Sequence, residues 1–79
     1  MKAASAGGAL DGRTKELMAF SISIAIRCED CIIFHLRAAL SHGAGREEIV
    51  EAISVAIEMG GGPSVVYGGR ALEALEGLS

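Results

Sequence analysis

The segment ELMAFSISIAIRCEDCIIFH, residues 16–35, decides whether this protein is built from helices or from strands. In its middle, residues 20–26 alternate large apolar and small side chains, and this alternation and the β-branched isoleucines favour a strand locally. No second strand-like run follows in the sequence, and a lone strand cannot satisfy its backbone hydrogen bonds. We therefore predict a helix over residues 14–26, with Asp11 as its N-cap, in an all-α protein.

Three further segments have the features of helices. Residues 29–42 are rich in apolar side chains and stop at Gly43, which suits the left-handed conformation that ends many helices. Residues 46–59 place apolar side chains on one stripe and acidic side chains in the first turn, where they complement the helix dipole. The glycines at 60–62 should break this helix, and a proline suits the first turn of a last helix over residues 63–78. The sequence predicts a small bundle of about four helices.

Residues 28–35 combine two thiols and an imidazole in the pattern C-x2-C-x3-H. On a helix that advances about 100° per residue, Cys28, Cys31 and His35 fall within roughly 60° of one another. The cysteines can form a disulfide if Cys28 sits at a helix N-terminus, where free N–H groups also favour a thiolate. His35 lies one turn beyond Cys31, placed to take or return a thiol proton. These three residues are therefore candidate catalytic residues.

Glu16 is the fourth candidate. In one continuous helix it would lie about 18 Å from Cys28 and could take no part. If the chain turns back near residues 26–28, the first two helices become antiparallel and Glu16 comes level with His35. There the carboxylate would orient the imidazole and relay its proton. We expect three apolar side chains to bury it, namely Leu17, Phe20 and Phe34.

These four residues, at the spacing E-x11-C-x2-C-x3-H, resemble the signature of the alkylhydroperoxidase D-like branch of the carboxymuconolactone decarboxylase family. The resemblance covers about residues 10–75. The flanking sequence agrees over three segments, residues 9–17, 35–40 and 59–63. The resemblance implies an all-α fold and a homo-oligomer, commonly a trimer or hexamer. It also implies peroxide reduction or disulfide exchange through the cysteines, with the Glu and His as proton relay and an electron donor that the sequence does not identify.

Two departures from the family pattern matter. The best-known peroxidase members have a His just before the second cysteine, whereas this chain has Asp30 there, next to Glu29. Two carboxylates between the thiols should oppose thiolate formation and make the dithiol less acidic and more reducing. Family domains also often carry more helix upstream of the Glu, and only a short arm precedes it here.

Either cysteine can be the attacking thiol. Cys28 is nearest the helix dipole and the solvent, but Glu29 and Asp30 place negative charge at that same turn. Activation of the Cys31 thiol depends instead on a base within reach, namely His35. We therefore expect Cys31 to be the nucleophile and Cys28 to be the resolving thiol.

Other interpretations of this segment stay open. The cysteines could be buried apolar side chains, or could bind zinc with His35 and a fourth ligand from another subunit or from His42. We expect no metal or cofactor, and we expect His42 to interact with a helix C-terminus. Tyr67 is expected in the core or an interface. The competing functions are a redox-responsive interaction module, in which the disulfide changes subunit packing, and a lyase like the family's decarboxylases, which do not depend on a C-x2-C pair.

The amino-acid composition indicates which kinds of partner the protein can bind. Hydrophobic residues make up 51% of the 79, more than so short a domain can usually bury, which predicts a homo-oligomer. The extra apolar faces should come from Ile22, Ile24, Ile26, Val65 and Val66. The longest strongly apolar stretch, residues 17–26, is about half of the roughly 20 residues that span a membrane. A net charge of −3 and scattered basic residues argue against nucleic acid and membrane surfaces.

The expected organisation is simple. Residues 1–9 are small and should form a flexible arm, and residues 10–79 should form one domain. No apolar signal segment is visible, which makes the cytoplasm the expected compartment. In a reducing compartment a close cysteine pair is more often catalytic or metal-binding than structural.

Overall fold

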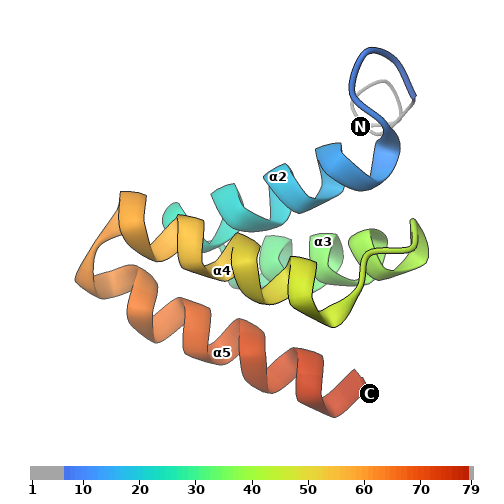
Figure 1. Ribbon diagram of the computed structural model, residues 1–79. Helices are drawn as coiled ribbons and strands as arrows, with labels where there is room; N and C mark the ends of the chain where they lie inside the picture. Colours follow the sequence, from blue (N-terminus) through green and yellow to red (C-terminus); the bar gives the residue numbers. More distant parts are fainter. Residues whose placement is uncertain (1–6, 79) are drawn as a thin grey trace.

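A computed structural model describes residues 7–78, which form four helices and no strand (Figure 1). The helices are α2 (Gly12–Ala25), α3 (Glu29–Ser41), α4 (Arg46–Gly60) and α5 (Gly62–Leu78). The predicted all-α fold is confirmed, and each predicted helix is correct to within two residues at either end. The predicted arm lies outside the described residues as far as residue 6.

The alternating segment of α2 is helical, as predicted. Phe20 and Ile24 are completely buried, while Ile22 and Ile26 are 55% and 63% exposed. Side chains four residues apart share one face of a helix, whereas a strand would have placed all four on the same side. Ile24 therefore belongs to the core and does not add to the apolar surface, contrary to our expectation. The N-cap prediction is confirmed, because Asp11 accepts a hydrogen bond from the Thr14 N–H. Hydrogen bonding by the Thr14 side chain, and then by its backbone N–H, lowers the pKa of Asp11.

A tight turn reverses the chain between α2 and α3. The Arg27 N–H donates to the Ile24 carbonyl at 3.1 Å, and the Cys28 N–H donates to the Ser23 carbonyl at 3.0 Å. This is the hydrogen-bond pattern of a Schellman motif, whose central residue normally is a glycine. Here Arg27 occupies that position with φ 62°. The predicted turn near residues 26–28 is confirmed, and it places α3 against α2.

A second turn of this kind ends α3, with a glycine in the left-handed position. Gly43 has φ 92°, and the Ala44 N–H donates to the Ala39 carbonyl at 3.0 Å. His42 Nδ1 lies 2.8 Å from the Ala38 carbonyl oxygen, so His42 interacts with the C-terminus of α3 as expected. In the next helix the Gly45 N–H donates to the Glu48 carboxylate, which stabilises the first turn of α4.

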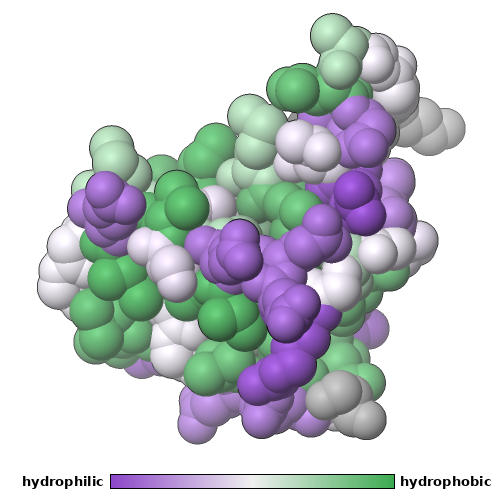
Figure 2. Space-filling model, viewed as in Figure 1, coloured by the Kyte–Doolittle hydropathy of each residue, from purple (hydrophilic) through white to green (hydrophobic). Residues whose placement is uncertain are grey.

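α2 contacts the other three helices, and α3 and α4 most extensively (Figure 1). Its buried face meets an apolar core that is drawn from all four helices and the α3–α4 connection, formed by Phe20, Ile24, Ile32, Leu36, Ala39, Ala44, Ile49, Ile53, Ala56, Ala71 and Leu75. Much apolar surface stays outside this core. Figure 2 shows such side chains over the end of the molecule where α4 turns into α5. No helix within residues 7–78 has the length and apolar character that crossing a membrane requires.

Candidate active site

The two cysteines lie where α3 begins. Cys28 is the N-cap of α3, and its sulfur accepts a hydrogen bond from the Cys31 N–H at 3.3 Å. The two residues form a disulfide bond across one helical turn, with their Cα atoms 5.2 Å apart. The extended backbone of Cys28, outside the helix proper, brings the two side chains together. The conditional prediction for Cys28, a helix N-terminal position that permits a disulfide, matches this geometry.

His35 and Glu16 meet between α3 and α2. His35 Nδ1 lies 2.7 Å from Glu16 Oε1, and Glu16 as a whole is 6% exposed. Because an ionised carboxylate can only accept hydrogen bonds, we assign the proton of the imidazole to Nδ1. That tautomer leaves Nε2 with a free lone pair, and within residues 7–78 no hydrogen bond engages Nε2. A base is therefore oriented one turn beyond Cys31.

The surroundings of the carboxylate differ from our expectation in one respect. Phe20, one helical turn after Glu16, is completely buried, and Leu17, which follows Glu16 directly, packs against the core. Phe34 is instead 61% exposed, because it lies about 100° around α3 from His35 and points away from the core. Its ring meets the His35 ring edge-on, with centroids 5.0 Å apart. Phe34 thus contacts the imidazole of His35 from a largely exposed position.

The sequence interpretation missed a cation at this site. Arg70 of α5 forms an ion pair with Glu29, the residue that follows Cys28. The guanidinium also lies over the ring of Tyr67, 4.9 Å from the ring centroid. Tyr67 itself is partly buried against the core, as expected. The acidic pair between the cysteines was visible in the sequence, but its partner lies 41 residues away and only the fold brings it close.

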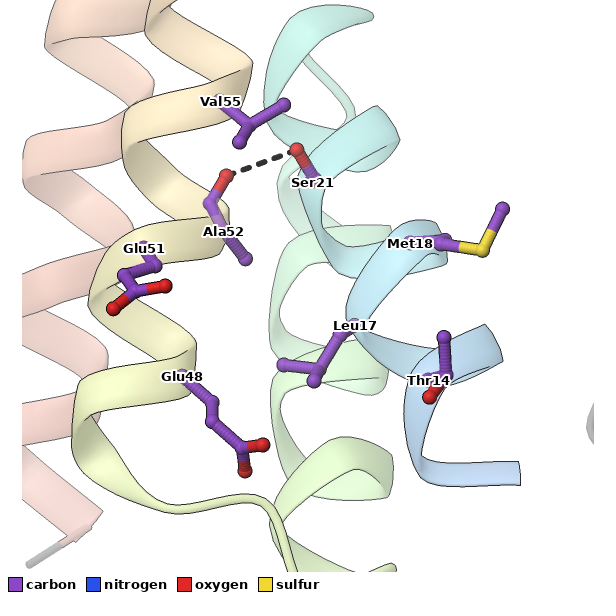
Figure 3. Close-up of a pocket in the computed structure, with 8 residues that line it drawn as sticks. All are labelled: Thr14, Leu17, Met18, Ser21, Glu48, Glu51, Ala52 and Val55. Carbon is purple, nitrogen blue, oxygen red and sulfur yellow. Dashed lines mark hydrogen bonds between the residues drawn. The ribbon is translucent and has the colours of Figure 1, made fainter. Parts of the chain in front are cut away.

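A separate groove lies between α2 and α4 (Figure 3). It has a volume of about 320 Å³ and is largely apolar at its centre. A hydrogen bond from Ser21 Oγ to the Ala52 carbonyl, 2.9 Å long, joins the two helices beside it. Its lining residues are Thr14, Leu17, Met18, Ser21, Glu48, Glu51, Ala52 and Val55. Because the groove contains neither a thiol nor an imidazole, we place the candidate active site at the dithiol.

Ligands for a metal ion are not assembled in the described part of the chain. Nowhere in residues 7–78 do three or more His, Cys, Asp or Glu side chains form a group that could hold a metal. In the disulfide form, the sulfurs bond to each other and His35 Nδ1 faces Glu16.

Known proteins resemble this chain in sequence and in structure. The model of the carboxymuconolactone decarboxylase family matches residues 1–75. An uncharacterized protein of Cupriavidus necator is 42% identical over 79 residues, which cover 100% of this chain and 70% of that protein. The uncharacterized protein 4 of the cox locus of Paracoccus denitrificans is 42% identical over 71 residues, 90% of this chain and 64% of that protein. The chain thus spans about two thirds of the length of these curated relatives.

Two crystal structures share the fold. A protein of the same family from Legionella pneumophila, in its apo form, superposes with a TM-score of 0.90 at 47% identity, covering 95% of this chain and 67% of that one. A family protein from Thermotoga maritima superposes with a TM-score of 0.92 at 42% identity, covering 98% of this chain and 79% of that one. The Thermotoga protein is described as possibly involved in an antioxidative response.

Proposed function

The chain belongs to the carboxymuconolactone decarboxylase family, and from this premise we propose that it is a dithiol enzyme that reduces peroxides or disulfides. Cys28 and Cys31 are its redox pair, and His35 and Glu16 its proton relay. The observation that carries the proposal is the 2.7 Å hydrogen bond between His35 and the buried Glu16, one turn beyond a C-x2-C pair. An oriented base at that place is what the activation of a thiol requires.

In the oxidative half of the cycle, Cys31 attacks. Its thiol proton passes to His35 Nε2, and the thiolate attacks the terminal peroxide oxygen. The O–O bond breaks and Cys31 becomes a sulfenic acid, while the departing alkoxide takes the proton from His35 and leaves as an alcohol. The Cys28 thiol then attacks the Cys31 sulfur, which releases water and closes the disulfide. The Glu16 carboxylate stabilises the imidazolium while His35 holds the proton.

In the reductive half, an external dithiol supplies two electrons and two protons. We propose that it attacks Cys31, so that Cys28 leaves as a thiolate. The Cys31 N–H that points at the Cys28 sulfur, 3.3 Å away, would stabilise that departing charge. In this scheme the base His35 serves Cys31, the attacking thiol, and the helix N-terminus serves Cys28, the leaving thiolate. A thiol-rich compartment such as the cytoplasm would supply the reductant.

The decisive experiment is peroxide turnover with a dithiol reductant, compared between the native protein and the Cys28→Ser, Cys31→Ser double variant. We expect the double variant to lose turnover and to keep its helical circular dichroism spectrum. Full turnover without the thiols would refute the proposal.

Two further measurements separate the competing functions. A redox-responsive interaction module would turn over neither peroxide nor disulfide, but would change its oligomer size on a sizing column after oxidation. A lactone-decarboxylating lyase would act on a lactone substrate in the double variant as well, because that chemistry needs no thiol pair.

A further inference from the structure

The N-terminus of α3 carries two opposing charge effects. Its free N–H groups favour a thiolate at the cysteines, and the carboxylates of Glu29 and Asp30, which lie between the cysteines in the sequence, disfavour one. Both carboxylates are in the first turn of the helix. Without a compensating positive charge, these carboxylates would lower the fraction of thiolate at neutral pH and slow the reactions of the dithiol.

The fold supplies a compensating cation. The Arg70 guanidinium pairs with Glu29 and is held from a second side by the Tyr67 ring, 4.9 Å from its centroid. An arginine fixed by two partners loses less freedom on pairing than one that projects freely into solvent. Arg70 therefore stays at this end of α3, beside the carboxylate that adjoins Cys28.

Three other titratable groups lie near the dithiol along the chain. Arg27 lies in the preceding turn and Asp30 in the same first turn, and His35 is engaged with Glu16 from α2. Among the described residues, Arg70 is the group that forms an ion pair with Glu29.

We propose that Arg70 is a positioning residue that sets the reactivity of the dithiol by neutralising Glu29. The inference rests on the proposed redox function in that the dithiol must cycle between oxidised and reduced forms. Reduction converts the Cys28–Cys31 bond into two thiols, with two electrons and two protons from a thiol reductant. A positive charge that stabilises a thiolate in the product favours the reduced form, and it speeds attack by raising the fraction of the thiol that is ionised. Arg70 acts in this direction and an unpaired Glu29 in the opposite one.

A charge cycle at the two positions tests this. Arg70→Gln leaves Glu29 unpaired, Glu29→Gln leaves Arg70 unpaired, and the double variant removes both charges. Two quantities are measured on each: the rate of iodoacetamide alkylation of the reduced protein against pH, and the position of the dithiol–disulfide equilibrium in glutathione buffers. Neither requires peroxide turnover, so failure of the proposed peroxidase function stays distinguishable from failure of this inference.

We expect Arg70→Gln to slow alkylation about two- to fivefold near pH 8 and Glu29→Gln to speed it by a similar factor, the size expected of an exposed ion pair. The double variant should return close to the native rate, and Arg70→Lys should keep most of it. The reduced fraction in glutathione should fall in Arg70→Gln and rise in Glu29→Gln. All differences should shrink when salt is raised from about 0.1 M to 1 M.

The matched control is Arg46→Gln. Arg46 pairs with Glu76 in a similarly exposed ion pair that joins the start of α4 to the end of α5, away from the start of α3. It should leave both quantities unchanged. Equal slowing in Arg46→Gln and Arg70→Gln would show a net-charge effect, and slowing in both Arg70→Gln and Glu29→Gln would show a structural one. Either result overturns the proposal, as does an Arg70→Gln protein that reacts like the native one.

Discussion

Glu16 and His35 show how one contact can serve both stability and chemistry. Glu16 is buried, and a buried carboxylate is costly unless a donor satisfies it. His35 provides that donor, and the same hydrogen bond selects the tautomer whose Nε2 can accept a proton. Removing either partner leaves the other buried and unsatisfied, so only shape-preserving substitutions separate the two functions.

Glu16→Gln is such a substitution. The amide keeps the shape and can still accept from Nδ1, but it no longer has the charge that stabilises an imidazolium. We expect peroxide-dependent turnover and thiol alkylation to slow about 10- to 100-fold, with the helical spectrum unchanged. Glu48→Gln, at a half-exposed carboxylate of α4, is the control and should leave both rates unchanged. If Glu16→Gln reacts at the native rate, Glu16 is only a structural residue.

The order of attack can be determined on single-cysteine variants. We expect brief peroxide treatment to produce sulfenic acid faster on Cys31 in the Cys28→Ser protein than on Cys28 in the Cys31→Ser protein, because Cys31 has the oriented base His35 one turn away. Mass spectrometry of the trapped sulfenic acid gives the two rates. The reverse order would assign the attack to Cys28 and show that the helix N-terminus outweighs the base.

Among the elements, the junction of α4 and α5 shows how differently three adjacent glycines can be used. Gly61 has φ 74°, a conformation that suits glycine. Gly60 is needed for space, since a Cβ there would lie 1.9 Å from Ser64 Oγ and 3.0 Å from Ser64 Cβ, and Ser64 is completely buried. A Cβ at Gly62 would meet nothing within 4 Å. The sequence predicted a helix break over this run but could not distinguish the three positions, because the close approach depends on how the two helices cross.

This difference gives a stability test. We expect Gly60→Ala to lower the free energy of unfolding by about 1–3 kcal/mol, the usual range for overpacking. Gly62→Ala, two residues away, should change it by less than about 1 kcal/mol. Urea denaturation followed by circular dichroism measures both. Equal values for the two variants would mean that Ser64 moves aside without cost.

At the scale of the whole molecule, contacts between residues that are close in the sequence could be predicted, and contacts between distant segments could not. The helices, the turn before Cys28 and the meeting of Glu16 with His35 follow from local periodicity, capping and one chain reversal, and all could be predicted. The Glu29–Arg70 pair could not, because many exposed arginines are compatible with one exposed glutamate until α5 is placed against α3. Phe34 was misplaced for a related reason, since an apolar residue was assumed to be buried in the single chain.

The exposed apolar surface points to assembly. Large apolar side chains are exposed on every helix, among them Met18 and Ile22 on α2, Phe34 on α3, Val55 on α4 and Val65 on α5. Isolated exposed apolar residues are ordinary, but so many on a chain of 79 residues are typical of subunit interfaces. We propose that copies of the chain associate through these faces, with the groove between α2 and α4 as one contact (Figure 3).

Light scattering should therefore give a mass of three or six times the 8.1 kDa of one chain, for a trimer or a hexamer. Val55→Lys places a charge at the edge of the groove, where burial against another copy would cost its hydration, so it should shift the protein toward a smaller species at micromolar concentration. Val55→Ile keeps an apolar side chain and should preserve the native mass. Circular dichroism must show both variants folded, which the exposure of Val55 in the single chain leads us to expect. A native protein that scatters as an 8.1 kDa monomer would mean that this apolar surface stays in contact with water, and the assembly argument would fail.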